Sequence, residues 1–129
     1  MWIEHINNTN FIIQLFDKIP ELVDVVIEQF NVNYYGRGIK IIIILPQFID
    51  NVPLKWKQKN YNAAVVEIDF GDISQFMMTM DDKKRSNIRI EDKGYGKIGI
   101  EINGGINASF MAEVGYIQNV NGYIIENPV

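Results

Sequence analysis

The chain has 129 residues, of which 47% are hydrophobic and 22% are charged, and its formal net charge is -4 at pH 7. This length and composition predict a single globular domain over residues 1–129, and they exclude a disordered chain. The lack of cysteine excludes disulfides, thiolate metal sites and cysteine nucleophiles, and the negative charge argues against a general affinity for nucleic acid.

The sequence carries no recognisable signal for secretion or membrane insertion. The residues after Met1 lack the basic and apolar regions of a signal peptide, and the aliphatic run from Ile41 to Leu45 is too short to span a bilayer. Proteins of a reducing compartment also dispense with disulfides. These features predict a cytoplasmic protein without a membrane partner.

One helix is expected, close to the N-terminus. Asn8, Thr9 and Asn10 are residues that cap helices, and apolar side chains follow at helical spacing from Phe11 to Phe16. Pro20 ends this element because it cannot donate the next backbone hydrogen bond. A helix of about two turns is stable only when it packs on other elements.

Strand-like patterns follow. Residues 21–35 are rich in β-branched and aromatic residues, although residues 23–26 also fit a helix, and residues 36–38 form a turn. The aliphatic run 39–45 predicts a central strand that is covered on both faces, with the N-terminal helix as one cover. Residues 46–59 are expected to form a loop.

Alternation of apolar and polar residues predicts a half-buried strand from Ala64 to Phe70. Further strands are expected at 73–80, 88–91, 97–102 and 106–112, with turns at 81–84, 92–94 and 103–105 and a last hairpin around Asn121-Gly122 that carries Tyr116, Tyr123 and Ile125. The chain is therefore predicted to be an α+β protein, mostly an antiparallel β meander with one short N-terminal helix. Its strands could form a curved sheet, a sandwich or a partly closed barrel.

The sequence offers little catalytic chemistry. His5 is the sole histidine and lies near a chain end, so neither a catalytic triad nor a zinc site is supported. Residues 94–99 match the G-x-G-x-x-G string of dinucleotide-binding proteins, but they lead into a strand pattern instead of a helix, which indicates a hairpin. We predict no enzymatic activity, no cofactor and no metal.

Three other patterns have two interpretations each. Glu67 and Asp69 share one strand face, which suits either a small hydrolase or a solvated sheet. Trp56 among lysines suits either single-stranded nucleic acid or packing at the edge of the core, and Met77, Met78 and Met80 suit either packing or a binding groove. We favour a solvated sheet face for Glu67 and Asp69. We favour packing at the edge of the core for Trp56 and packing for the three methionines.

The sequence resembles the immunity protein 50 family over roughly residues 2 to 80. The resemblance lies in Trp2, Asn7-Asn8, Leu15-Phe16, Pro20, Leu22, Pro53-Leu54-Lys55-Trp56, Tyr61-Asn62 and Ile68-Asp69-Phe70. Asp17 and Glu21 depart from the family pattern, both after the predicted helix. Trp2, Phe16, Pro53 and Trp56 are bulky and apolar or cyclic, so we assign them to the fold.

The resemblance implies a bacterial immunity protein that neutralises a cognate toxin domain by occlusion, without chemistry of its own. Polymorphic-toxin domains include basic nucleases, for which an acidic inhibitor is complementary. The candidate toxin-binding residues are the acidic positions Glu67, Asp69, Asp72, Asp81 and Asp82, with exposed aromatic residues as anchors. A small-molecule-binding β-barrel and a subunit of a larger assembly are the alternatives, and the oligomeric state is left open, a dimer included.

Overall fold

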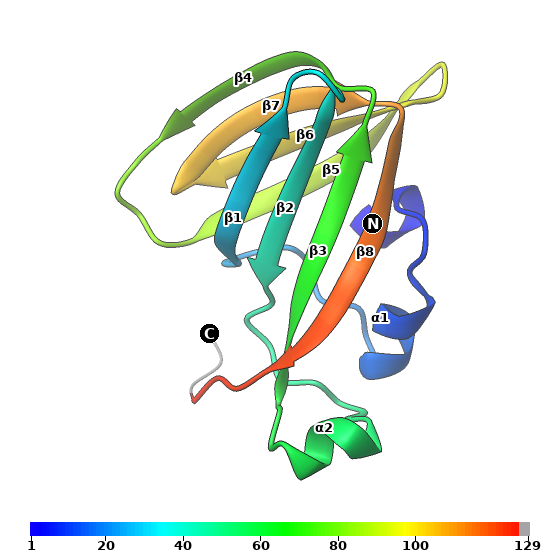
Figure 1. The fold of residues 1–129 in the computed structure, drawn as a ribbon, viewed down its shortest axis with the longest axis vertical. Helices are drawn as coiled ribbons and strands as arrows, with labels where there is room; N and C mark the ends of the chain where they lie inside the picture. Colours follow the sequence, from blue (N-terminus) through cyan, green and yellow to red (C-terminus); the bar gives the residue numbers. More distant parts are fainter. Residues whose placement is uncertain (127–129) are drawn as a thin grey trace.

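The computed structural model describes residues 1–126, in which eight strands form two antiparallel four-stranded sheets (Figure 1). Sheet A has the order β1 (Val26–Asn33), β2 (Gly38–Ile44), β3 (Ala63–Gly71) and β8 (Val114–Tyr123). Sheet B has the order β4 (Ser74–Met80), β7 (Ile106–Ala112), β6 (Lys97–Gly104) and β5 (Ser86–Gly94). The helical segments are η1 (Trp2–His5), α1 (Asn10–Leu15) and α2 (Leu54–Gln58). The predicted α+β class, with antiparallel sheets and a short N-terminal helix, is confirmed, and within residues 1–126 the strands do not close into a barrel.

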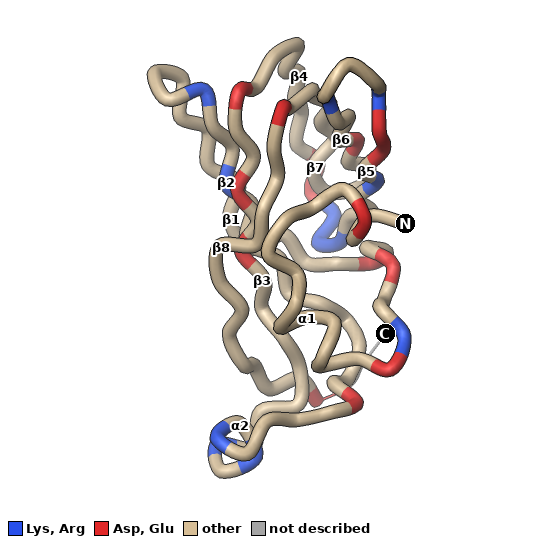
Figure 2. Tube along the Cα trace, turned by 90° about the vertical axis from the view of Figure 1, so that its right-hand side faces the viewer, with Lys and Arg blue, Asp and Glu red and all other residues tan. Residues whose placement is uncertain are grey.

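Sheet A buries only one of its two faces. Ile39, Ile41 and Ile43 on β2 are at most 1% exposed, and they alternate with half-buried neighbours at positions 40, 42 and 44. Figure 2 places sheet B and α1 on the same side of sheet A, so that its other side is left open. The prediction that both faces of this strand are covered was wrong, because isoleucine also fits the half-exposed face of a pleated sheet.

The order of the strands differs from a simple meander in two places. β4 pairs with β7, and the chain returns from sheet B to place β8 beside β3. The hairpin predicted at Asn121-Gly122 was wrong, because both residues lie inside β8, where Gly122 pairs with Ala64. Glycine at position 122 instead allows the Tyr61 ring to lie close to the β8 backbone, since a Cβ there would lie 2.0 Å from Cδ2 of Tyr61.

The predicted N-terminal helix is present as α1, with Thr9 at its N-cap, but it ends at Leu15, before Pro20. The second helix, α2, was missed, because five residues are too few to show a helical period. Its Trp56 ring packs edge-on against Phe11, at 5.5 Å between centroids, and against Tyr61, at 6.1 Å. The packing interpretation of Trp56 therefore holds, and the lysines around it stay exposed on α2, which Figure 2 shows in blue.

The N-terminal segments cover edges of both sheets. Asn7 pairs with β8 through hydrogen bonds to Gly115 and Ile117, each at 2.9 Å. Val25 forms a bridge with Ser86 at the start of β5, so the region predicted as strand from residue 21 enters β1 only at Val26. Such cover protects edge strands from pairing with other chains.

The buried core lies between sheet A and its cover of sheet B and α1. Trp2 and Phe16, which we assigned to the fold, are both buried in it, and the indole Nε1 of Trp2 donates a hydrogen bond to the carbonyl oxygen of Pro20 at 2.9 Å. In the chain up to residue 126, no helix is long and apolar enough to cross a membrane.

The glycine string at residues 94–99 forms the hairpin between β5 and β6. Gly94 and Gly96 have φ angles of 80° and 74°, and Tyr95 at the tip also has a positive φ. Because strands flank this turn on both sides, the string has no helix N-terminus that could receive a pyrophosphate. The hairpin interpretation is confirmed, although the turn lies two residues beyond the predicted one.

Candidate functional site: the open face of sheet A

The uncovered side of sheet A presents three cross-strand rows of side chains, which we call the open face. Strand register gives the rows as Asn31–Lys40–Asp69–Tyr116, Gln29–Ile42–Glu67–Asn119 and Val26–Ile44–Val65–Asn121. The first row is polar and charged, while the third is mostly aliphatic. An uncovered sheet face that combines aliphatic side chains with polar groups resembles the surfaces through which proteins bind other proteins.

A hollow of about 430 Å³ lies at the polar end of the open face, and we call it the Asp69 hollow. Its lining includes Asn31, Asn33, Lys40, Asp69, Gly71 and Tyr116. Asp69 is partly buried, and its Oδ1 atom is buried without a hydrogen-bond partner among residues 1–126. A buried carboxylate oxygen without a donor is unfavourable, and this distinguishes Asp69 from the other carboxylates of the described residues.

The structure brings two of the five acidic candidates together and separates the others. Glu67 and Asp69 point outward from β3 on the open face, and Asp72 lies exposed in the turn that follows β3. Asp81 and Asp82 are exposed in the connection between β4 and β5. The side chain of Asp81 accepts a hydrogen bond from Asn107 of β7, so Asp81 and its neighbour Asp82 lie with sheet B.

A second hollow, of about 540 Å³, lies at the other side of the β1–β2 hairpin, between the hairpin and the start of β4. Tyr34 and Tyr35 at the hairpin tip are 92% and 99% exposed. Arg37 joins the hairpin to the β3–β4 turn, because its backbone carbonyl accepts from the Ile73 N–H at 3.0 Å and its guanidinium donates to the Ile73 carbonyl at 3.1 Å. Two solvent-exposed aromatic rings thus stand beside the polar end of the open face.

Three of the seven non-glycine residues with a positive φ angle in the described chain lie at the same end of the molecule. Arg37, Asp72 and Gln75 all have positive φ angles, between 51° and 54°, although none of them is glycine. Left-handed backbone in such residues is uncommon and often accompanies functional loops.

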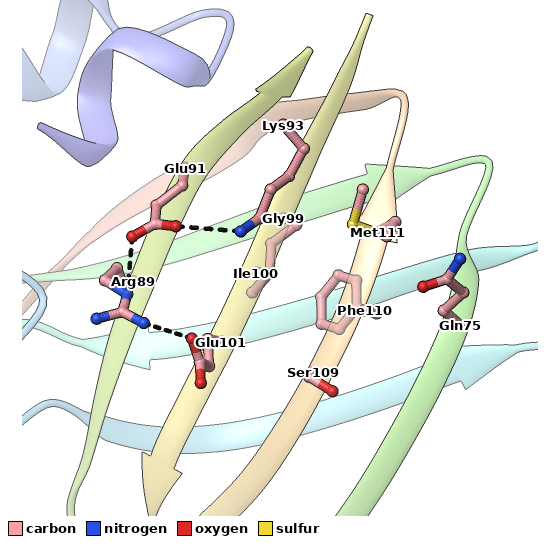
Figure 3. Close-up of a pocket in the computed structure, with 10 residues that line it drawn as sticks. All are labelled: Gln75, Arg89, Glu91, Lys93, Gly99, Ile100, Glu101, Ser109, Phe110 and Met111. Atoms are coloured by element: carbon pink, nitrogen blue, oxygen red, sulfur yellow. Dashed lines mark hydrogen bonds and ion pairs between the residues drawn. The ribbon is translucent and has the colours of Figure 1, made fainter. Parts of the chain in front are cut away.

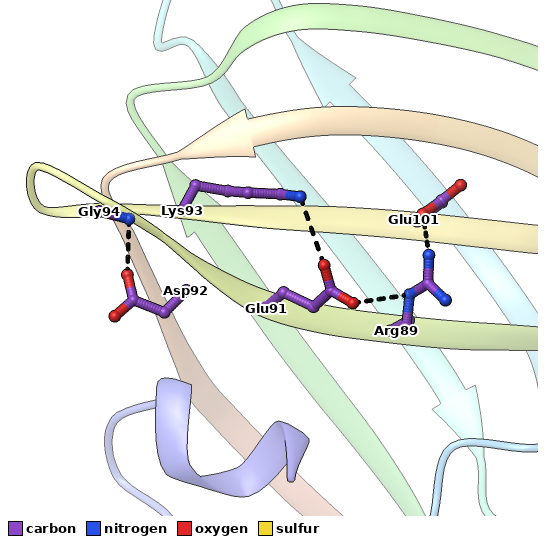
Figure 4. A network of polar contacts seen from close by, with 6 residues as sticks. All are labelled: Arg89, Glu91, Asp92, Lys93, Gly94 and Glu101. Atoms are coloured by element: carbon purple, nitrogen blue, oxygen red, sulfur yellow. Dashed lines mark hydrogen bonds and ion pairs between the residues drawn. The ribbon is translucent and has the colours of Figure 1, made fainter.

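The outer face of sheet B carries a hollow of about 270 Å³, but its charges are already paired (Figure 3). Glu91 binds Arg89 at 3.0 Å and Lys93 at 3.3 Å, and Glu101 binds the other end of the same guanidinium (Figure 4). The hydrogen bond that Arg89 donates to Glu101, followed by the charge of Glu91, raises the pKa of Arg89 above its usual value. A site whose charges neutralise each other attracts a charged partner less than one with unpaired carboxylates.

The geometry gives no support to the hydrolase alternative. Glu67 and Asp69 lie on an open sheet face, and Glu67 does not line the hollow that Asp69 lines. A glycosidase places both carboxylates across a cleft that holds the scissile bond. His5 lies in η1, and the described residues contain no group of three His, Asp or Glu side chains that could hold a metal ion.

Several residues of the open face were not found by sequence reasoning. Lys40, Tyr116 and Asn31 join Asp69 only through the register of four strands that are distant in sequence. Lys40 gave one usable signal, because a charged residue inside the aliphatic run 39–45 indicates that one strand face meets water. The exposed Tyr34 and Tyr35 carry no sequence signal that separates them from buried tyrosines.

Comparison with known proteins gives one assignment. The family model described as Immunity protein 50 matches residues 8–123, which extends the resemblance from the first strands through β8. Searches of curated proteins and of solved structures found no similar chain. Because the matched region is nearly the whole chain, the protein belongs to the immunity protein 50 family.

Proposed function

We propose that this protein binds a cognate bacterial toxin domain and neutralises it by covering its active site or an adjacent surface, without catalysing a reaction. Membership of the immunity protein 50 family supports the role and implies the toxin partner. The observation that carries the proposed mechanism is the open face of sheet A, a broad surface that neither sheet B nor α1 covers.

The open face supplies what an inhibitory interface needs. Ile42, Ile44 and Val65 offer partly exposed aliphatic area, and the rows beside them offer polar groups for orientation. Glu67 and Asp69 make none of the ion pairs found within residues 1–126. We propose these two carboxylates as toxin-binding residues, with Tyr34 and Tyr35 of the adjacent hairpin as aromatic anchors.

The remaining acidic candidates have smaller parts in this proposal. Asp72 lies at the strained end beside the β1–β2 hairpin, so we place it at the rim of the interface. Asp81 and Asp82 lie with sheet B, so we assign them only to the overall negative field. A basic toxin such as a nuclease would gain association rate from that field, because opposite charges steer the diffusional encounter.

We also propose that the protein acts as one domain in the cytoplasm. The core shared by both sheets and α1 supports one folding unit. A chain without cysteine suits a reducing compartment, where an immunity protein protects the cell that makes the toxin.

The proposal is tested by co-expression with the toxin encoded next to this protein. Growth should be rescued, and the two proteins should co-purify as a stable complex. The double variant Ile42→Lys, Glu67→Lys should lose rescue, because it places two cations on the open face. The matched control is Met77→Lys, Glu101→Lys on the outer face of sheet B, which makes the same change of charge and should keep rescue. A toxin that is neither bound nor neutralised by the wild-type protein would disprove the proposed function.

A further inference from the structure

The strongest unexplained feature of the molecule is the carboxylate of Asp69. Its Oδ1 atom is buried and accepts no hydrogen bond from any part of residues 1–126. A buried carboxylate oxygen without a donor is unfavourable, so such a group usually has a partner in its functional state. Lys40 lies directly across from Asp69 on β2, yet the two side chains form no ion pair in the described chain.

The surroundings of Asp69 favour a cationic, planar donor. The side-chain amide of Asn31 donates to Gln29 at 3.3 Å, which leaves the Asn31 carbonyl oxygen free to accept. Tyr116 lies across from Asp69 on β8, is 37% exposed and is one of the residues that line the hollow. Carboxylate and amide oxygens beside an aromatic ring form the kind of environment in which proteins bind guanidinium groups.

The charge balance along β3 points the same way. Glu67 is the next outward residue on the strand and adds a second negative charge beside the hollow. Lys40 is the single cation among the residues that form the three rows of the open face. The carboxylates there outnumber the cation by two to one, in a protein whose net charge is -4.

We propose that the Asp69 hollow receives an arginine side chain of the partner protein, whose guanidinium pairs with the carboxylate of Asp69 while its plane lies against Tyr116. The inference rests on the proposed function for the identity of the partner, since it places the arginine on the toxin. It goes beyond that function by naming the contact on which binding depends. Lys40 competes with the incoming cation, because it has the same charge and lines the same hollow.

Three variants test the contact through the dissociation constant of the complex with the toxin. Asp69→Asn keeps the shape of the side chain and should weaken binding about tenfold or more, since hydrogen bonds to charged groups are the strong ones. Lys40→Gln should tighten binding, because it removes a like charge from the hollow. Asp82→Asn removes the same charge as Asp69→Asn in the sheet B region, and it should change binding less than about twofold.

The stability of the free protein provides a second readout. Asp69→Asn should unfold at the same temperature as the wild type or at a higher one, because it removes a partly buried charge that has no ion-pair partner. Weaker binding together with unchanged or greater stability supports a binding role. Equal loss of binding and stability would show that Asp69 serves the fold, and would overturn the inference.

A toxin-independent test separates this inference from the proposed function. Ethylguanidinium is titrated into the free protein, and backbone amide shifts are followed by NMR. Shifts should be confined to the ends of β1, β2, β3 and β8 around Asp69, and Asp69→Asn should abolish them. If the toxin is not bound but these shifts occur, the proposed partner is wrong and the cation site stands. If the toxin is bound but Asp69→Asn binds it like the wild type, or Lys40→Gln binds it more weakly, the cation site is wrong and the proposed function stands.

Discussion

The alternation of β2 provides a sharp test of which face of sheet A is packed. Ile42 and Ile43 are neighbours of identical chemistry, but Ile43 is 0% exposed in the core and Ile42 points to the open face. Ile43→Ala removes three buried carbon atoms and leaves a cavity between sheet A and its cover. Substitutions of this kind lower the free energy of unfolding by about 2–5 kcal/mol.

For Ile43→Ala we expect a loss in the upper half of that range, because no solvent reaches the site and the neighbouring Ile41 and Val66 are also fully buried. Ile42→Ala loses side-chain contacts that are only partly buried, so we expect about 1 kcal/mol or less. Urea denaturation followed by circular dichroism measures both values, with equal m-values as the check that both variants unfold from the same native state.

Binding should show the reverse order. Ile42→Ala should weaken the complex with the toxin, while Ile43→Ala, measured where it is folded, should bind like the wild type. Similar losses of stability in the two variants would refute the one-sided burial of sheet A. A stable Ile42→Ala that binds with full affinity would remove Ile42 from the proposed interface.

Four further predictions concern stability and association. Trp2→Phe should cost about 1–3 kcal/mol in urea denaturation, because the buried carbonyl of Pro20 loses its donor at 2.9 Å. Gly104→Ala should cost more than about 2 kcal/mol, since its Cβ would lie 2.4 Å from a backbone oxygen, whereas Gly96→Ala, with φ 74° in open space, should cost about 1 kcal/mol. Arg89→Gln should leave the urea midpoint nearly unchanged, because its ion pairs with Glu91 and Glu101 are exposed to solvent, and a clear drop would contradict this. Raising the salt concentration should slow association with a basic toxin and leave dissociation nearly unchanged, as stopped-flow mixing can show; a salt-independent association rate would exclude electrostatic steering.

The sequence by itself determined the class of the fold and most of its strands. Alternation placed β3 with Ala64, Val66, Ile68 and Phe70 inward, and the strand predicted at 106–112 is β7. Those signals are local, because the two-residue period of a strand records which face is buried. The residues resembling the immunity protein 50 family also pointed to the correct family, since a packed core constrains the bulky positions that carry the match.

Local patterns misled where packing between distant residues decided the outcome. The aliphatic run 39–45 predicts burial on both faces, but sheet B and α1 lie on one side only. The type of residue at Gly122 suggests a turn, but Gly122 lies inside β8, where the absence of a side chain leaves room for the ring of Tyr61. The position of a covering layer cannot be detected from the local periodicity of a sequence. The same holds for a contact between residues about sixty positions apart, such as Tyr61 and Gly122.

The candidate site divides in the same way. Sequence reasoning placed Glu67 and Asp69 on one exposed face, because both occupy the polar phase of a single strand. It could not join them to Lys40, Tyr116 and the β1–β2 hairpin, nor separate them from Asp81 and Asp82, because strand order and register set those relations. Register is fixed by the burial of all the strands together. For this reason only the tertiary structure reveals the hollow around Asp69 and the unpartnered oxygen in it.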